Sequence, residues 1–229
     1  MTLLPLLIAG LSFLGSHVLL SSTSLRGTLR DQLGERGFLL LYSAVAFATL
    51  AWFIHSYAQA PLVPLWAFQP WMVYFPVAVM PFASVLLVSG LTVPNPTAVG
   101  MERRIEVHDP APGILRVTRH PVMWAIGLWA LAHMVPNGDA ASLIFFGMFA
   151  VLALGGTLLI DRKKRLSLGT HWARLVEVTS NVPFQALIAG RTSLRPGEIG
   201  LLRLVAGLLL YSVLLLAHPL YTGRPIPIY

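Results

Sequence analysis

Histidine is the residue type in this chain that could carry metal or cofactor chemistry inside a membrane. The sequence has seven histidines and no cysteine, which excludes disulfides, thiolate metal sites and thiolate-attached haem. His17 and His133 each lie deep within an apolar run, where ionisable side chains are rare and usually functional. His218 lies in a third such run, but like His55 it is interpreted as a residue of the membrane interface. The sequence therefore predicts an intramembrane site built from imidazoles.

The depth of these histidines can be estimated from the nearest basic residue, which marks one membrane surface. At a rise of 1.5 Å per residue, His17 lies ~14 Å from Arg26, His133 ~21 Å from Arg119 and His218 ~22 Å from Arg203. His133 and His218 thus match in depth more closely than His133 and His17, although helix tilt can absorb part of the ~7 Å difference. An alternative interpretation is that each neutral imidazole only donates a hydrogen bond across the helices.

A second group with chemical potential is the sequence Arg119–His120–Pro121, at the start of an apolar run. Proline suits the first turn of a helix, and the two preceding side chains are placed to meet lipid head groups or the anionic part of a ligand. The alternative is a plain anchor at the membrane surface. Asp161 and Glu177 are interpreted as surface charges.

These residues must be positioned by membrane-spanning helices, because the chain has 56% apolar and only 11% charged residues, against about 25% charged in soluble domains. Runs of roughly 20 apolar residues mark helices that can cross the bilayer. The fold class is therefore predicted as all-α, a polytopic membrane helix bundle in one domain over residues 1–229. About six spans are expected, of which the fourth is the shortest: 2–24, 37–58, 71–92, 120–136, 140–160 and 199–219.

The charge pattern predicts the topology. Lysine and arginine concentrate in three connections, after the first, third and fifth apolar runs, whereas the sequences AQAPLVPLWAFQPW and VPNGD contain neither. The positive-inside rule then places the basic connections in the cytoplasm and both termini outside. In a bacterium this means a multi-pass inner-membrane protein with periplasmic termini. The net charge of +7 is explained by topology, so no nucleic-acid partner is expected.

Several stretches together resemble the NnrU family of bacterial membrane proteins, which is associated with denitrification and nitric oxide metabolism. They are SHVLLSSTSLRGTLRDQLGERGFLLLYSAVAFATL, GILRVTRHPVMWAIGLWALAH, DRKKRLSLGTHWARLVEVTSNVPFQALIAGR and AHPL. The family includes 15-cis-ζ-carotene isomerase, a membrane protein that uses haem b. The resemblance implies that His17 and His133 ligate haem b and that Arg119 and His120 help to bind it.

Two departures from the isomerase pattern bear on activity. Ala130 stands where plant isomerases have a cysteine near the second ligand, and residues 140–160 lack a further histidine. A weaker resemblance links the Arg-His-Pro sequence to membrane methyltransferases that bind S-adenosylmethionine, but Met123 replaces their usual tyrosine.

The first functional hypothesis is therefore a haem-b membrane protein with a redox or nitrogen-oxide role. The alternatives are a haem-dependent cis–trans isomerase of a polyene lipid, a methyltransferase acting at Arg119 and His120, and an assembly or transport factor without catalysis. The expected partners are haem and a membrane lipid or lipophilic polyene. The oligomeric state is left open by the sequence.

Overall fold

The computed structural model describes residues 2–97, 111–195 and 197–223. Within them the regular secondary structure is helical, apart from an isolated bridge between Pro64 and Asp139. Arg103, Arg104, His108 and Arg224, which the charge and histidine patterns include, lie outside the described residues. The predicted all-α fold is confirmed.

The apolar runs form helices close to the predicted bounds. They are α1 (Leu4–Ser22), α2 (Leu25–Ala58), α3 (Tyr74–Thr92, after a 3-10 turn at Pro70–Val73), α4 (Pro121–Met134), α5 (Ala140–Ala150) and α9 (Leu201–Thr222). Five helices in the described residues are long and apolar enough to cross a membrane. The short α4 is the exception, as the length of its apolar run suggested.

Two helices extend beyond the apolar runs that predicted them. Helix α5 continues through a π-helical turn at Val151–Gly155 into α6 (Gly156–Leu168), so the basic run after residue 160 is helical. Helix α2 begins at Leu25, well before the predicted start, and is broken at Gly34, whose φ of 72° favours glycine. The chain between α6 and α9 adds α7 (Thr170–Val178) and the short α8 (Gln185–Ile188).

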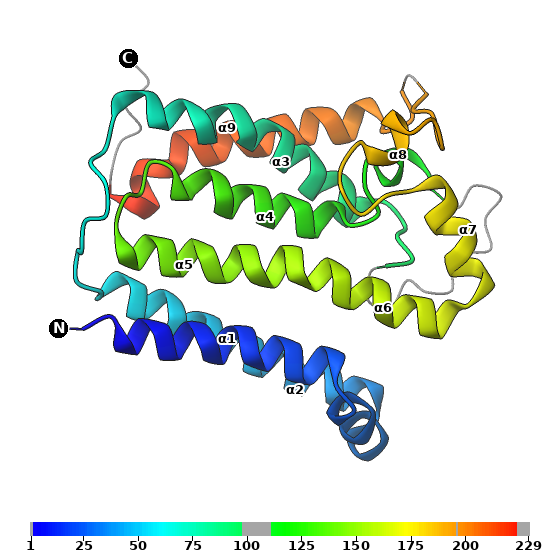
Figure 1. Cartoon of the computed structure of the whole chain (residues 1–229), viewed down its shortest axis with the longest axis horizontal. Helices are drawn as coiled ribbons and strands as arrows, with labels where there is room; N and C mark the ends of the chain where they lie inside the picture. Colours follow the sequence, from blue (N-terminus) through cyan, green and yellow to red (C-terminus); the bar gives the residue numbers. More distant parts are fainter. Residues whose placement is uncertain (1, 98–110, 196, 224–229) are drawn as a thin grey trace.

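The bundle has two sides joined through α4 and α5 (Figure 1). On one side α3 packs against both α4 and α9, and on the other α1 packs against α2 and α5. The beginning of α1 and the end of α9 lie at the same end of the bundle (Figure 1). The opposite end carries α6, α7, α8 and the basic connections, and we call it the basic end.

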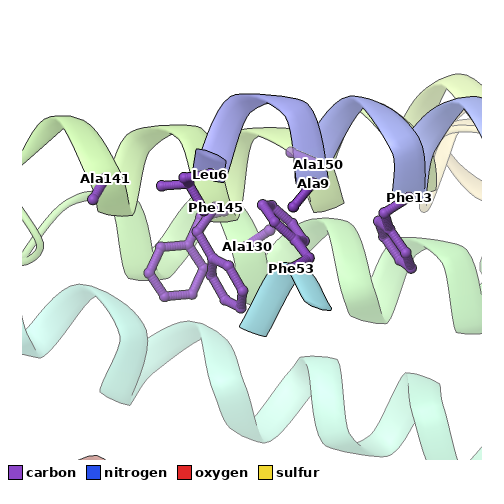
Figure 2. Close-up of a cluster of buried hydrophobic side chains, with 9 residues drawn as sticks. Leu6, Ala9, Phe13, Phe53, Ala130, Ala141, Phe145 and Ala150 are labelled. Atoms are coloured by element: carbon purple, nitrogen blue, oxygen red, sulfur yellow. The ribbon is translucent and has the colours of Figure 1, made fainter. Parts of the chain in front are cut away.

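Two hydrophobic cores hold these helices together. One lies between α1, α2, α4 and α5 and is rich in phenylalanine (Figure 2): Leu6, Ala9, Phe13, Phe53, Ala130, Ala141, Phe145, Phe146 and Ala150. The other packs the basic end: Leu86, Val93, Ala111, Ile114, Leu115, Val117, Ala125, Trp172 and Leu175. Neither core fills the space between α3, α4 and α9 at the end opposite the basic end.

Candidate functional site

A cavity of about 540 Å³ occupies that space. We call it the histidine cavity, and its end of the bundle the cavity end. Its volume lies within the range of about 300–1,000 Å³ typical of small-molecule and cofactor sites. Most of its lining is apolar: Phe68, Val73, Pro76, Val77, Met80, Trp129, His133, Pro136, Asn137, Tyr211, Leu214, Leu215, His218 and Tyr221.

Two of the histidines singled out in the sequence meet in this cavity. His133 lies near the end of α4 and His218 near the end of α9, and both line the cavity. The His133 Nδ1 donates to the Trp129 carbonyl at 2.8 Å. His218 Nδ1 lies 3.1 Å from the Thr222 hydroxyl, whose own proton goes to the His218 carbonyl. Both rings therefore carry the proton on Nδ1 and the lone pair on Nε2.

Prolines supply further polar groups to the cavity wall. Pro81 in α3 and Pro219 in α9 have no N–H, so each leaves the carbonyl four residues earlier without its helical donor. Those carbonyls belong to Val77 and Leu215, which both line the cavity. The Tyr211 hydroxyl donates to the Val77 carbonyl at 3.3 Å and so links α9 to α3. The wall thus combines an apolar surface with a few fixed polar atoms.

His17 is not among the lining residues. Its Nδ1 donates to the Phe13 carbonyl at 2.8 Å, and its ring packs edge-on against Tyr42 in α2. Phe149 touches both Phe13 and Trp129, which sets those two residues at about the same level. His17 lies one turn from Phe13 toward the basic end, and His133 one turn from Trp129 toward the cavity end.

These two turns separate the backbones of His17 and His133 by roughly 12 Å along the bundle axis. Each ring folds back toward the carbonyl four residues earlier, so the two imidazoles are less far apart along the axis than the backbones. The rings of Phe13, Phe149 and Trp129 lie between them. The structure therefore brings His133 together with His218 and not with His17. Haem ligation by any of the three stays a prediction.

Arg119 and His120 form a separate polar cluster at the basic end, centred on Asp161 of α6. The Arg119 guanidinium makes a bidentate ion pair with the Asp161 carboxylate. His120 Nε2 donates to the same carboxylate at 2.6 Å. Arg119 is 8% exposed and His120 2% exposed, so both lie inside the protein and not on its surface. Their role in binding a cofactor stays a prediction.

The cluster is held by neighbours from several elements. The Asn181 side chain donates to Asp161 and to the Thr157 hydroxyl, and the Trp172 ring lies under the Arg119 guanidinium. Burial lowers the pKa of His120, against the opposing effect of its hydrogen bond to Asp161. The His120 Nδ1 has no hydrogen-bond partner among the described residues.

The prediction for Asp161 was wrong. This residue was interpreted as a surface charge beside a basic run, whereas it is half-buried and binds two cationic or polar side chains from the start of α4. One signal could have found it. Asp161 is the first charge after the long apolar run that begins at Ala140, so it lies where a helix leaves the bilayer and a partner is needed. Glu177, by contrast, is exposed as expected.

A family model confirms what the sequence motifs indicated. The model of the NnrU protein family matches residues 5–226, which is nearly the whole chain. The chain belongs to the NnrU family. This match spans both the histidine cavity and the cluster around Asp161, so both sites lie within the family's shared region.

A relative in plants is also similar. The chloroplastic 15-cis-zeta-carotene isomerase of Arabidopsis thaliana is 30% identical over 174 residues, which cover 73% of this chain and 46% of the plant protein. The matched region thus spans about half the length of that relative. No solved structure matches the chain.

Proposed function

We propose that this NnrU-family protein binds haem b in the histidine cavity through His133 and His218. We further propose that it acts there as a cis–trans isomerase of a lipophilic polyene. The observation that carries the proposal is the pair of imidazoles lining one mainly apolar intramembrane cavity. The similarity to a carotene isomerase supports the choice of reaction class.

The residues present fit a haem. Histidine is a usual axial ligand of haem iron, and ligating histidines donate their other ring N–H to a fixed acceptor. His133 and His218 meet both conditions, because each holds its proton on Nδ1 against a protein oxygen. An apolar wall around the two rings suits a macrocycle and keeps water away from the iron.

The choice of ligand pair departs from the resemblance, which implies His17 and His133. His17 is not among the residues that line the histidine cavity. His218 lines the same cavity as His133. We therefore propose His218 as the second ligand. His17 is the competing candidate for the same role.

A bound haem would supply a redox-active iron, which is chemistry that the side chains of this cavity lack. The chain's own residues would hold and shape the site. His133 and His218 fix its position from two helices, and Tyr211 braces α9 against α3 through the Val77 carbonyl. Trp129 and Met80 present apolar surface to a lipophilic ligand.

The redox or nitrogen-oxide role associated with the family is the alternative, and it would use the same haem. A methyltransferase acting at Arg119 and His120 has less support, because Asp161 already occupies the polar groups of both side chains. We also propose that the protein lies in a bacterial inner membrane with its basic end in the cytoplasm, as the positive-inside rule indicates.

The test is optical, on the purified protein in detergent or nanodiscs. We expect a haem Soret band that His133→Ala and His218→Ala each shift or abolish, whereas His17→Ala and the exposed His55→Ala leave it unchanged. Added imidazole should partly restore the band in His133→Gly, which separates a lost ligand from a lost fold. Loss of the band in His17→Ala with retention in His218→Ala would establish the other pair, and a haem-free wild type would refute the proposal.

The reaction class is tested separately. A cis-configured carotene incubated with haem-loaded protein should give the trans isomer, followed by chromatography, and His133→Ala should not. A protein that keeps its Soret band and leaves the carotene unchanged would favour the redox alternative.

A further inference from the structure

The histidine cavity is closed toward the basic end by glycines that let α3 approach its neighbours. A Cβ at Gly207 of α9 would lie 2.7 Å from the Val85 Cα, and one at Gly90 of α3 would lie 2.8 Å from the Pro121 Cγ. Contacts this short exist only because glycine lacks a side chain. The three helices therefore meet tightly in the half of the bundle that contains the basic end.

The cavity end is bordered by the connection between α2 and α3, residues 59–69. Phe68 of this connection and Tyr221 of α9 line the cavity and are 49% and 61% exposed. This connection is tied to the turn between α4 and α5. Leu65 and Trp66 donate backbone hydrogen bonds to the Gly138 carbonyl, and the Trp66 indole donates to the Val135 carbonyl. A Cβ at Gly138 would lie 2.5 Å from the Trp66 carbonyl oxygen, so the connection packs closely against this turn.

The remaining boundary is the side between α4 and α9. Each of these helices packs along α3, but they barely contact each other. Leu214 of α9 lines the cavity and is nevertheless 38% exposed, so it lies at the edge of the opening. The neighbouring surface of α9 is apolar and suited to lipid: Leu208, Leu209, Val213, Leu216 and Leu220 are exposed.

We propose that the histidine cavity opens sideways into the bilayer between α4 and α9, and that a long conjugated hydrocarbon chain enters it there from the membrane. This rests on the proposed function for the identity of the ligand, but the opening itself follows from the packing. Tightly packed helices close the cavity toward the basic end, and the side between α4 and α9 faces lipid. The hydrocarbon enters the cavity beside Leu214, with its conjugated segment directed toward His133 and His218.

The chemistry of the opening favours such a chain over a water-soluble ligand. An apolar chain already dissolved in the bilayer meets only leucine and valine side chains on the neighbouring surface of α9. A conjugated chain is also stiff, so it loses little conformational entropy when it is held in a fixed cavity.

The experiment uses nitroxide spin labels on the full-length protein in nanodiscs, where the absence of native cysteine makes single-cysteine variants clean. Leu215→Cys places a label on the cavity wall, and Leu209→Cys places the control label on the exposed face of α9. Collisions with oxygen, which concentrates in lipid, and with a water-soluble nickel chelate are measured at both positions. A Met80→Cys label on α3 serves if Leu215→Cys does not fold.

We expect the Leu215 label to collide with oxygen at a rate within about threefold of the Leu209 label and to be protected from the nickel chelate. Adding cis-parinaric acid, a conjugated fatty acid, should immobilise the Leu215 label and leave the Leu209 label unchanged. Nickel access at Leu215 would show an opening to water, and protection from both reagents would show a closed cavity. Either result would overturn the proposal, as would an unchanged Leu215 spectrum with the fatty acid.

The Soret band of the same samples keeps this inference separate from the proposed function. A haem band together with a closed or water-filled cavity would refute the lateral opening but not the haem assignment. A lipid-accessible cavity that binds the conjugated chain in a protein without haem would remove the haem assignment and leave the opening.

Discussion

The ionisable residues at the two ends of the α3–α4 pair have opposite surroundings. At the basic end, Arg119, His120 and Asp161 bond mainly to one another and are enclosed by protein. At the cavity end, His133 and His218 direct one nitrogen to the protein and border a space large enough for a ligand. Arg119, His120 and Asp161 thus fix helices in place, whereas imidazoles bordering a cavity are available for chemistry.

The largest expected effect comes from removing the charge at the centre of the cluster. Asp161→Asn leaves the Arg119 guanidinium buried without its ion pair, which should destabilise the protein by about 3–5 kcal/mol. Chemical denaturation in detergent micelles measures this. Glu177→Gln, at an exposed carboxylate, should stay within about 0.5 kcal/mol of the wild type. Equal effects of the two variants would return Asp161 to the role of a surface charge.

A smaller effect is expected where α9 crosses α3. Gly207→Ala forces a Cβ against the Val85 backbone, and overpacking of this kind costs about 1–3 kcal/mol. It should also shift the Soret band if the crossing shapes the histidine cavity. Gly15→Ala in α1 is the matched control, because no atom lies within 4 Å of the added methyl group. A stable Gly207→Ala protein with an unaltered Soret band would show that the α3–α9 crossing does not shape the histidine cavity.

Arg119→Lys tests whether the geometry of the ion pair matters beyond its charge. Lysine keeps the charge but cannot make the bidentate contact with Asp161, so we expect a loss of about 1.5 kcal/mol in unfolding free energy. Arg162→Lys, at an exposed position in the same helix as Asp161, should be neutral. Haem content should not change in either variant, because neither arginine lines the cavity. A loss of haem in Arg119→Lys alone would restore its predicted role in cofactor binding.

The smallest expected effect is a change in pH dependence. Because burial holds the pKa of His120 below its value in the unfolded chain, the unfolded state binds more protons than the folded state near pH 6. Stability contributed by His120 is therefore present above its unfolded pKa of about 6.5, and is lost as the pH falls below it. His120→Gln should flatten the fall in unfolding free energy between about pH 7 and 5. A steeper fall in the variant would contradict the direction of the shift.

Much of the fold could be predicted because the bilayer imposes a simple rule on sequence. Long apolar runs gave helices with nearly the right ends, and Pro121 begins α4 as expected. The helical residues Leu25–Leu33 before the break at Gly34 were missed because they are polar and show no apolar run. Helix α7 was missed for a similar reason, since its apolar side chains, Trp172 among them, are few and spaced for one buried face.

The candidate sites were predictable only in part. Depth along each helix matched His133 with His218, but no property of the sequence indicates which helices surround a common space. The histidine cavity is bordered by the close crossing at Gly207 and by the connection that packs against Gly138, and both are contacts between distant parts of the chain. Asp161 was misjudged because a carboxylate beside a basic run has the same sequence pattern whether it faces water or Arg119.

The position of α9 in the chain has a consequence for biosynthesis. Two walls of the histidine cavity, α3 and α4, are complete by Met134, whereas α9, which carries His218, begins only at Leu201. At synthesis rates of about 5–20 residues per second, α9 leaves the ribosome several seconds after α4. During this interval the cavity wall that carries His218 is not yet in place beside His133. Any cofactor held by both histidines must therefore be acquired after the last wall has entered the membrane, which makes loading a step that follows insertion.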